Sequence, residues 1–234
     1  SESEPTSERV TTMDTTALIL SLKLAFWTCV ILFPVAIFFG RLLAWRQFAG
    51  KAWLEAVIAL PLVLPPTVLG FYLLLGMGAT SPLGEFYFSL TGNHLVFSFD
   101  GLLVASVIFN LPFAIQPMQR AFEAIPANIR EAAWCCGLSR FESLWRIELP
   151  LAWPGAMSAL ALTFAHTLGE FGVVLMVGGS IEGETKTIAI SIYDRVQAFD
   201  NHTAGTMSAL LLVFSLVTIG FVYRLTYQRR QQVK

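Results

Sequence analysis

Five long stretches of this chain contain no charged residue, and they limit its possible folds more than any other feature. They cover residues 24–40, 56–84, 101–119, 149–169 and 201–223. A helix needs roughly 20 mainly apolar residues to cross a bilayer, and each stretch reaches or approaches that length with its flanks. Charged residues make up only 13% of the chain, whereas soluble domains carry about 25%. We therefore expect an all-α polytopic membrane protein.

These stretches predict five transmembrane helices, with a sixth left open. Residues 1–14 are polar and are expected to be disordered, residues 15–227 to form the transmembrane domain, and residues 228–234 to form a cytoplasmic tail. Prolines and glycines interrupt several stretches, so freed backbone groups need partners in a packed bundle or along a water-lined pathway. The expected cores of the helices are residues 18–40, 54–78, 101–121, 151–178 and 204–226.

Lysine and arginine are distributed unevenly over this arrangement. The first connection carries three of them, the third carries four and the C-terminal tail carries four, which places eleven on one side. The opposite side has Arg9, Lys23, Lys186 and Arg195. Cytoplasmic loops of membrane proteins are enriched in these residues. We therefore expect the N-terminus outside the cell and the C-terminus in the cytoplasm.

A polar segment, EAAWCCGLSRFESLWRIELP at residues 131–150, separates the third and fourth stretches. Asn128 is a good N-cap residue and Glu131 follows three positions later, which predicts a helix start. Gly137 is placed to end that helix in a left-handed cap. The whole loop, residues 126–150, is expected on the cytoplasmic side.

A second short helix is expected directly after the glycine turn. Ser139 and Glu142 have the spacing of a capping box. Phe141, Leu144 and Trp145 follow at helical spacing and give this helix an apolar face. Such a helix could lie on the membrane surface or fill a groove on a partner protein, and the residues alone leave both interpretations open.

The same segment resembles the EAA loop of the membrane subunits of ABC importers. In that family the loop holds a coupling helix that docks into a separate ATPase subunit, which would place the contact at residues 138–146. The matched pattern consists of Glu131, Ala132, Ala133, Gly137, Ile147, Leu149 and Pro150. The residues for which the resemblance implies ATPase coupling are Glu131, Ala132, Ala133, Gly137, Leu138, Ser139, Arg140, Phe141 and Glu142.

Other segments narrow the resemblance to molybdate permease subunits, although sulfate and tungstate permeases share much of the pattern. The segments are AGKAWLEAVIALPLVLPPTVLGFYLLL, TLGEFGVVLMVGG and GETKTIAISIYDRV, and the likeness covers residues 15–227. It implies a type I ABC importer permease fold in a bacterial or archaeal cytoplasmic membrane. The implied partners are a second copy of the chain, two cytoplasmic ATP-binding subunits and a periplasmic molybdate-binding protein. His166 departs from the pattern, because an arginine is commoner at its position.

Import of a molybdate dianion against a negative interior needs energy. Moving two charges against about 100 mV costs about 5 kcal/mol. Gly50 and Lys51 lack the upstream glycine and following hydroxyl residue of a P-loop. We therefore expect a non-catalytic chain that binds no cofactor, with ATP and Mg²⁺ held by a partner ATPase. The cysteines and histidines have no metal-ligand spacing, and a net charge of −1 gives no bulk attraction to nucleic acid.

Breaks in the expected helices supply candidates for a gate or translocation pathway. Glu170 lies in an apolar run, and acids within a membrane are functional candidates. Its carboxylate would repel an oxyanion, so we expect it to pair with backbone N–H groups near Gly169 and Gly172, or with a cation such as Lys186 or Arg195. The candidates are Pro65, Pro66, Gly169, Glu170, Phe171 and Gly172.

Three alternatives compete with a molybdate or tungstate importer. A sulfate or thiosulfate ABC permease would share most of the pattern. A secondary transporter would usually carry intramembrane charge pairs or two similar halves, and neither is evident. A membrane-embedded enzyme is disfavoured, because the chain contains neither H-E-x-x-H nor G-x-S-x-G.

Overall fold

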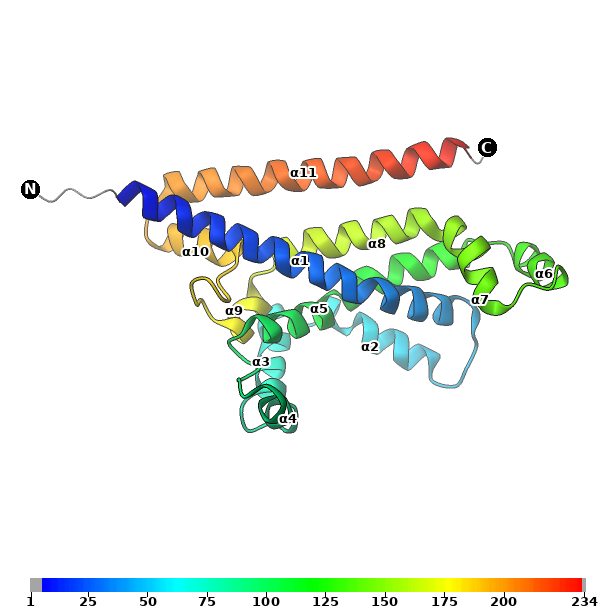
Figure 1. Ribbon diagram of the computed structural model, residues 1–234, viewed down its shortest axis with the longest axis horizontal. Helices are drawn as coiled ribbons and strands as arrows, with labels where there is room; N and C mark the ends of the chain where they lie inside the picture. The colour runs from blue at the N-terminus through cyan, green and yellow to red at the C-terminus, as the bar shows by residue number, and fades with distance from the viewer. Residues whose placement is uncertain (1–5, 233–234) are drawn as a thin grey trace, which may run out of the picture.

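The computed structural model describes the backbone of residues 6–232, with side chains over residues 15–220 and at Arg224. Residues 1–5 and 233–234 lie outside the described part. The described elements are all helical, and the longest run side by side along one axis (Figure 1). They are α1 (Thr6–Trp45), α2 (Lys51–Val63), α3 (Pro66–Met77), α4 (Pro82–Thr91), α5 (Phe99–Glu123), α6 (Ala127–Cys135), α7 (Arg140–Ser143), a π-helical segment η1 (Leu144–Glu148), α8 (Leu149–Gly169), α9 (Gly172–Gly178), α10 (Ile188–Gln197) and α11 (Asn201–Gln232).

The first helix begins earlier than the sequence predicted. Residues 6–14 were expected to be disordered, but their backbone forms the first turns of α1. The chain has neither glycine nor proline between Thr6 and Phe33, so nothing in the backbone chemistry stops the helix from extending outward. Residues 1–5 of the predicted disordered segment lie outside the described residues.

Four described helices are long and apolar enough to cross a membrane, and a bent pair brings the number to five. The single helices are Thr15–Trp45, Phe99–Glu123, Arg140–Gly169 and Asn201–Gly220. The pair is α2 and α3, which meet at an angle of 113°. The span expected at residues 54–78 is therefore broken in two, at the prolines that the sequence marked as interruptions. Pro65 and Pro66 both lack a backbone N–H, and the ladder of helical hydrogen bonds ends before them.

The fourth predicted span ends earlier than expected. It was placed at residues 151–178, but α8 ends at Gly169 and α9 begins separately at Gly172. Glu170 between them has extended backbone angles. The break at Glu170 has a local cause, because Gly169 and Gly172 lie on either side of it and glycine has a low helix propensity.

A three-helix core of α1, α5 and α8 holds the bundle together. Its largest apolar cluster lies toward the end of the bundle that carries α6 and α7, and includes Leu32, Leu43, Met118, Phe122 and Ala152. A second cluster joins α3, α5 and α9. The helix α11 runs beside α8 and α10 but keeps most of its apolar surface exposed, as a lipid-facing helix would.

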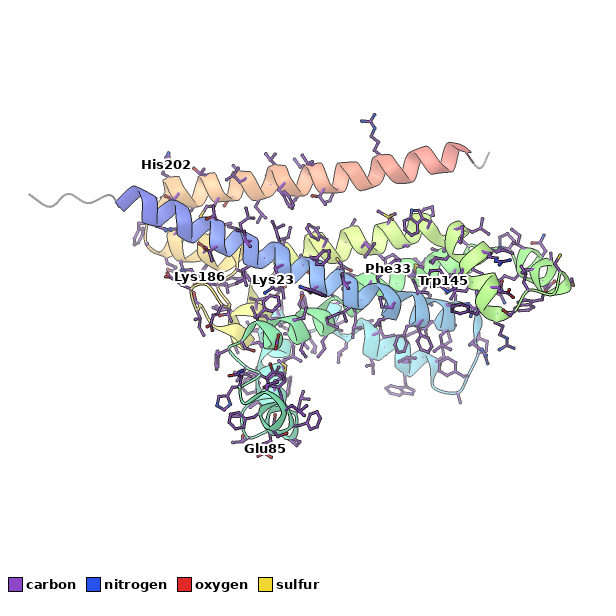
Figure 2. All side chains as sticks on the ribbon, viewed as in Figure 1. Lys23, Phe33, Glu85, Trp145, Lys186 and His202 are labelled. Carbon is purple, nitrogen blue, oxygen red and sulfur yellow. The ribbon has the colours of Figure 1, made fainter. Side chains whose placement is uncertain are left out.

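The two ends of the bundle differ in charge. The end of α1, the end of α5 and the α6–α7 segment lie toward the right in Figure 1, and the end of α11 lies on the same side but apart from them. These elements carry most of the basic residues that the sequence placed on one side, while Lys51 begins α2 and Lys234 lies outside the described residues. Figure 2 shows Lys23 and Lys186 toward the end where α1 begins and Trp145 toward the opposite end. An α3–α4 arm projects from the side of the bundle, with Glu85 at its tip.

Candidate functional site

The polar insert between α5 and α8 begins with α6, but not through the predicted cap. Asn128 was expected to be the N-cap, whereas Pro126 occupies that position and provides no side-chain cap. Proline is well suited to a helix start because its fixed φ is close to the helical value. Asn128 and Glu131 lie within α6, and both are exposed.

Gly137 ends α6 in the predicted left-handed conformation, with a φ of 80°. The Gly137 N–H donates to the carbonyl of Trp134, and the Leu138 N–H donates to the carbonyl of Ala133. This pair of bonds is a Schellman motif, which satisfies two carbonyls at the helix end. The turn places α7 directly after α6 in a compact arrangement.

The predicted capping box at Ser139 is confirmed. The Ser139 hydroxyl accepts from the Glu142 backbone N–H, and the Glu142 carboxylate accepts from the Ser139 N–H at 2.9 Å. The second short helix is not separate, however, because α7 continues through η1 into α8. The π-helical turn precedes Pro150, which cannot donate to a helical carbonyl.

The three apolar residues of this helix divide between two environments. Phe141 is 70% exposed and Trp145 is 52% exposed, and their rings make an edge-to-face contact. Leu144 instead packs against the apolar cluster of the bundle. Phe141 and Trp145 therefore form an outward-facing aromatic surface at one end of the molecule, and Trp134 of the same insert is also exposed. Exposed aromatic patches of this kind mark interaction sites.

The predicted coupling residues fall within this insert but differ in exposure. Ala133 is buried and Leu138 and Glu142 are half-buried. The exposed members are Glu131, Ala132, Gly137, Ser139, Arg140 and Phe141. The structure therefore gathers the set in one place, with Ala133 supporting the fold of α6 and the others available at its surface.

The insert is attached to α1 by an ion pair between a partly exposed arginine and a buried carboxylate, which the sequence analysis missed. Arg41 of α1 contacts both carboxylate oxygens of Glu148, with the Nε to Oε2 distance at 2.6 Å and the Nη2 to Oε1 distance at 3.0 Å. The Glu148 side chain has no exposed surface. Its position at the charged end of an apolar stretch was the available sequence signal, but its distant partner was not visible.

The two predicted breaks lie against each other, although Pro66 is exposed and Gly172 is half-buried. Pro66 at the start of α3 lies against Gly172 at the start of α9, where an added Cβ would be 2.8 Å from the Pro66 Cβ. The structure thus brings together gate candidates that lie about a hundred positions apart in the sequence. Pro65 is exposed and Phe171 is half-buried, while Gly169 is exposed beside the break.

Glu170 adopts one of the two arrangements expected from the sequence. Its Oε1 accepts from the Val173 backbone N–H at 2.8 Å, so the carboxylate caps the start of α9. The alternative, a pairing with Lys186 or Arg195, is not the arrangement observed. Lys186 lies 2.8 Å from Asp194, and Arg195 lies 3.6 Å from Asp200.

A chain of buried polar side chains links α1, α5 and α8, and sequence analysis did not identify it. Thr28 donates to the Ser106 hydroxyl at 2.9 Å, and the Asn110 amide donates to the Thr167 hydroxyl at 3.1 Å. His166 Nδ1 lies 3.0 Å from Asn110 Oδ1. An asparagine within an apolar stretch was the one signal for this network, because buried amides need partners.

Two cavities lie away from the helix breaks. A cavity of about 440 Å³ near the start of α1 is lined by charged residues that include Lys186 and Asp194. Another, of about 400 Å³, is lined by residues of α1, α2 and α5 that include Glu55 and Gln119. Neither of these two cavities is lined by the gate candidates. Lys23 sits over the Phe99 ring, with its ammonium 4.3 Å from the ring centre.

The chain is similar in sequence to known transport proteins. Residues 34–232 match a family described as binding-protein-dependent transport system inner membrane component. The "Molybdenum transport system permease protein ModB" of Azotobacter vinelandii is 43% identical, over 90% of this chain and 93% of that protein. Its namesake in Escherichia coli (strain K12) is 33% identical, over 91% and 95%. A probable sulfate transport system permease protein of Chlorella vulgaris is 30% identical, over 87% and 76%.

Solved structures share the fold at low sequence identity. A chain of the bacterial ABC transporter that imports the acidic polysaccharide alginate has a TM-score of 0.74 at 16% identity, covering 92% of this chain and 79% of that chain. A chain of the MetNI methionine ABC transporter in inward-facing conformations has a TM-score of 0.68 at 18% identity, covering 97% and 99%. At these identities the likeness describes the fold of the helices.

Proposed function

Because this chain belongs to the family of binding-protein-dependent transport system inner membrane components, we propose that it is the membrane subunit of an ATP-driven importer of molybdate. It is a multi-pass protein of the inner membrane and provides a translocation route rather than a catalytic centre. The observation that carries the substrate assignment is the likeness to the molybdenum permease of Azotobacter vinelandii across nearly the whole of both chains. Tungstate, of the same shape and charge, fits the same proposal.

The insert supports a separate ATPase as the energy source. Its aromatic surface, with Phe141 and Trp145 exposed, suits a cleft on a soluble partner. The capping box and Schellman turn hold this surface rigid, so a movement of the partner would be passed on rather than absorbed. In this proposal two ATPase subunits, which hold ATP and Mg²⁺, bind two copies of this chain from the cytoplasm.

The outer end would receive the oxyanion from a periplasmic binding protein. The uneven distribution of basic residues favours the insert and the C-terminus inside the cell, with the start of α1 outside. Transport then alternates between inward- and outward-facing states by rigid-body movement of packed helices. In this proposal the helix breaks at Pro66 and Gly172 are the points at which such a movement opens or closes the path.

The function is tested by reconstituting the chain in proteoliposomes with the ATPase and binding protein that co-purify with it. ATP supplied on the side of the vesicle membrane that carries the ATPase subunits should drive accumulation of radiolabelled molybdate on that side. A non-hydrolysable nucleotide should not. Excess tungstate should compete, and excess sulfate should compete far less. Accumulation without ATP or an ATPase subunit would identify a secondary carrier instead.

A sulfate permease is the second candidate, favoured by the likeness to the sulfate permease of Chlorella vulgaris. The same vesicles separate the two. Preferential uptake of radiolabelled sulfate over molybdate, with a binding protein that holds sulfate, would replace molybdate with sulfate and leave the importer mechanism intact.

A further inference from the structure

The proposed function leaves unexplained a charged cluster at the base of the insert. Glu148 is completely buried at the end of η1, where the insert becomes α8. A buried carboxylate is costly unless it is paired and hydrogen-bonded. Arg41 satisfies both requirements through two contacts, and the Ser143 hydroxyl donates a further bond to Oε1 at 3.0 Å. The cluster therefore joins the last turns of α1 to both ends of the α7–η1 segment.

Arg41 also contacts the backbone of the insert itself. Its Nη2 donates to the carbonyl of Arg140 at 3.2 Å, in the first turn of α7. One guanidinium thus holds the start of α7 and the end of η1 at the same time. Its planar, fork-shaped set of donors is what permits this arrangement, and a lysine could not reproduce it.

A second contact fastens α6 to the same part of α1. The guanidinium of Arg130 lies over the Trp45 ring, 3.8 Å from its centre. The Trp45 indole N–H donates to the carbonyl of Phe122 near the end of α5, and the Trp45 and Phe122 rings make an edge contact. Burial of the Arg130 guanidinium lowers its pKa, and the negative charge of nearby Glu148 partly offsets this by raising it.

These contacts make α1 a link between the insert and the rest of the helical bundle. The helix α1 packs along most of α5 and contacts α8, so it reaches from the insert to the far end of the molecule (Figure 1). A movement of α7 carries Glu148 with it, and the two bonds from Arg41 require α1 to follow. Without these bonds, α7 would connect to the bundle mainly through η1 and α8.

We propose that the Arg41–Glu148 pair is a positioning element that transmits movement of the insert to α1, so that ATP hydrolysis by the partner and opening of the translocation path occur together. This inference rests on the proposed function of the chain as an importer subunit. Arg41 and Glu148 act through α7 and α1, and neither contacts the transported anion in this proposal.

The decisive variant removes both charges together. Arg41→Met/Glu148→Gln removes both charges of the pair at once, so neither Arg41 nor Glu148 is left as a single charge without the other, and replacing an ion pair by neutral residues is often tolerated. The amide that replaces the Glu148 carboxylate still offers an oxygen to the Ser143 hydroxyl. We expect the complex to assemble in wild-type amounts, while molybdate accumulated per ATP hydrolysed falls at least tenfold. Arg41→Lys keeps the charge but loses the two-pronged contact, and should fall between the double variant and the wild type.

Lys51→Met provides a matched control. Lys51 also forms an ion pair at this end of the molecule, with Glu55 at 3.9 Å, but Glu55 is 40% exposed, whereas Glu148 has no exposed surface, and the Lys51–Glu55 pair lies within one helix. It should leave the ratio of uptake to hydrolysis within twofold of the wild type. A ratio that falls as far in Lys51→Met as in the double variant would overturn the proposal.

Two other results would also overturn it. One is a double variant that assembles and keeps the wild-type ratio. The other is a loss of uptake that merely follows the loss of assembled complex, which would make the pair a structural contact. Failure of the proposed function looks different, because the wild-type complex itself would then show no ATP-dependent uptake of molybdate.

Discussion

Individual polar residues within the apolar part of this chain are matched to particular partners. Glu170 accepts from the Val173 backbone N–H, Thr28 is bonded to Ser106, and Asn110 lies between His166 and Thr167. In the bilayer core no water is present to hydrogen-bond such polar groups, so each hydrogen bond that is lost leaves a donor or an acceptor unsatisfied. Their partners come from other helices or from the next helical turn, and they fix how those helices pack.

Glu170 gives a residue-scale prediction about its role. Glu170→Gln keeps an oxygen that can accept from Val173, whereas Glu170→Leu leaves this buried N–H without a partner. We expect Glu170→Leu to lower the free energy of unfolding by about 1–3 kcal/mol and Glu170→Gln to lower it by much less. Thermal unfolding of the purified chain in detergent measures both.

Uptake by the same variants separates the structural role from a chemical one. If Glu170 acts as a backbone acceptor, Glu170→Gln should retain a large part of molybdate uptake. A Glu170→Gln variant that is as stable as the wild type but transports nothing would show that the negative charge itself is required.

At the scale of helices and turns, the candidate site is shaped by the glycine turn of the insert and by the two helix breaks at Pro66 and Gly172. The insert is rigid because Gly137 and the capping box at Ser139 close both sides of one turn. The helix breaks are stable because Pro66 and Gly172 pack against each other. In both places a short sequence pattern sets the local backbone conformation. A contact in the folded chain then determines how the neighbouring helices are arranged.

Gly137→Ala tests the rigidity of the insert. An L-residue at a φ of 80° costs about 1–2 kcal/mol, so the turn should be strained or rearranged. We expect uptake per ATP hydrolysed to fall severalfold in the reconstituted complex. Gly92→Ala is the matched control, because Gly92 caps α4 with a φ of 73°. Its stability should fall by a similar amount while coupling stays normal, and equal loss of coupling in both variants would contradict a special role for the insert.

Gly172→Ala tests the contact between the two breaks. The new methyl group would lie 2.8 Å from the Pro66 Cβ, and overpacking of this kind costs about 1–3 kcal/mol. At Gly169, three residues earlier, an added Cβ meets nothing within 4 Å. Thermal unfolding should therefore show a clear loss of stability for Gly172→Ala and almost none for Gly169→Ala. Equal losses would mean that the close approach of α3 and α9 is not maintained in the membrane.

At the scale of the whole molecule, the ends of the bundle define its two faces. The start of α1 and the insert lie at opposite ends (Figure 1), and the candidate path would run between them. Arg41 of α1, Arg120 of α5 and the basic residues of the insert lie toward one end, and this distribution predicts the direction of the chain in the membrane.

Cysteine labelling tests this orientation. Cys135 and Cys136 are exposed in the insert, so an impermeant maleimide should label the chain, expressed alone, in inverted membrane vesicles and not in intact spheroplasts. A variant with serine at Cys135 and Cys136 and with Glu182→Cys has a thiol beside Lys186 at the other end. It should be labelled in intact spheroplasts and not in inverted vesicles. We expect at least a tenfold difference in labelling in each case. Labelling of Cys135 and Cys136 from outside would reverse the orientation.

The sequence by itself determined the helical class, the approximate positions of the spans and the turn chemistry of the insert. Uncharged length, capping residues and a positive-φ glycine act within a few residues of each other, so they can be read along the chain. It indicated interruptions near Pro65 and Glu170 but not the bend that follows, since proline and glycine mark a break and not the direction taken after it.

Tertiary structure alone decided which distant residues meet. Arg41 finds Glu148, Pro66 meets Gly172, and Asn110 reaches His166 across separations that no local pattern encodes. It also turned Leu144 toward the bundle and left Phe141 and Trp145 exposed. The physical reason is that burial and pairing depend on the surface a neighbouring helix presents, and that surface exists only once the helices have packed.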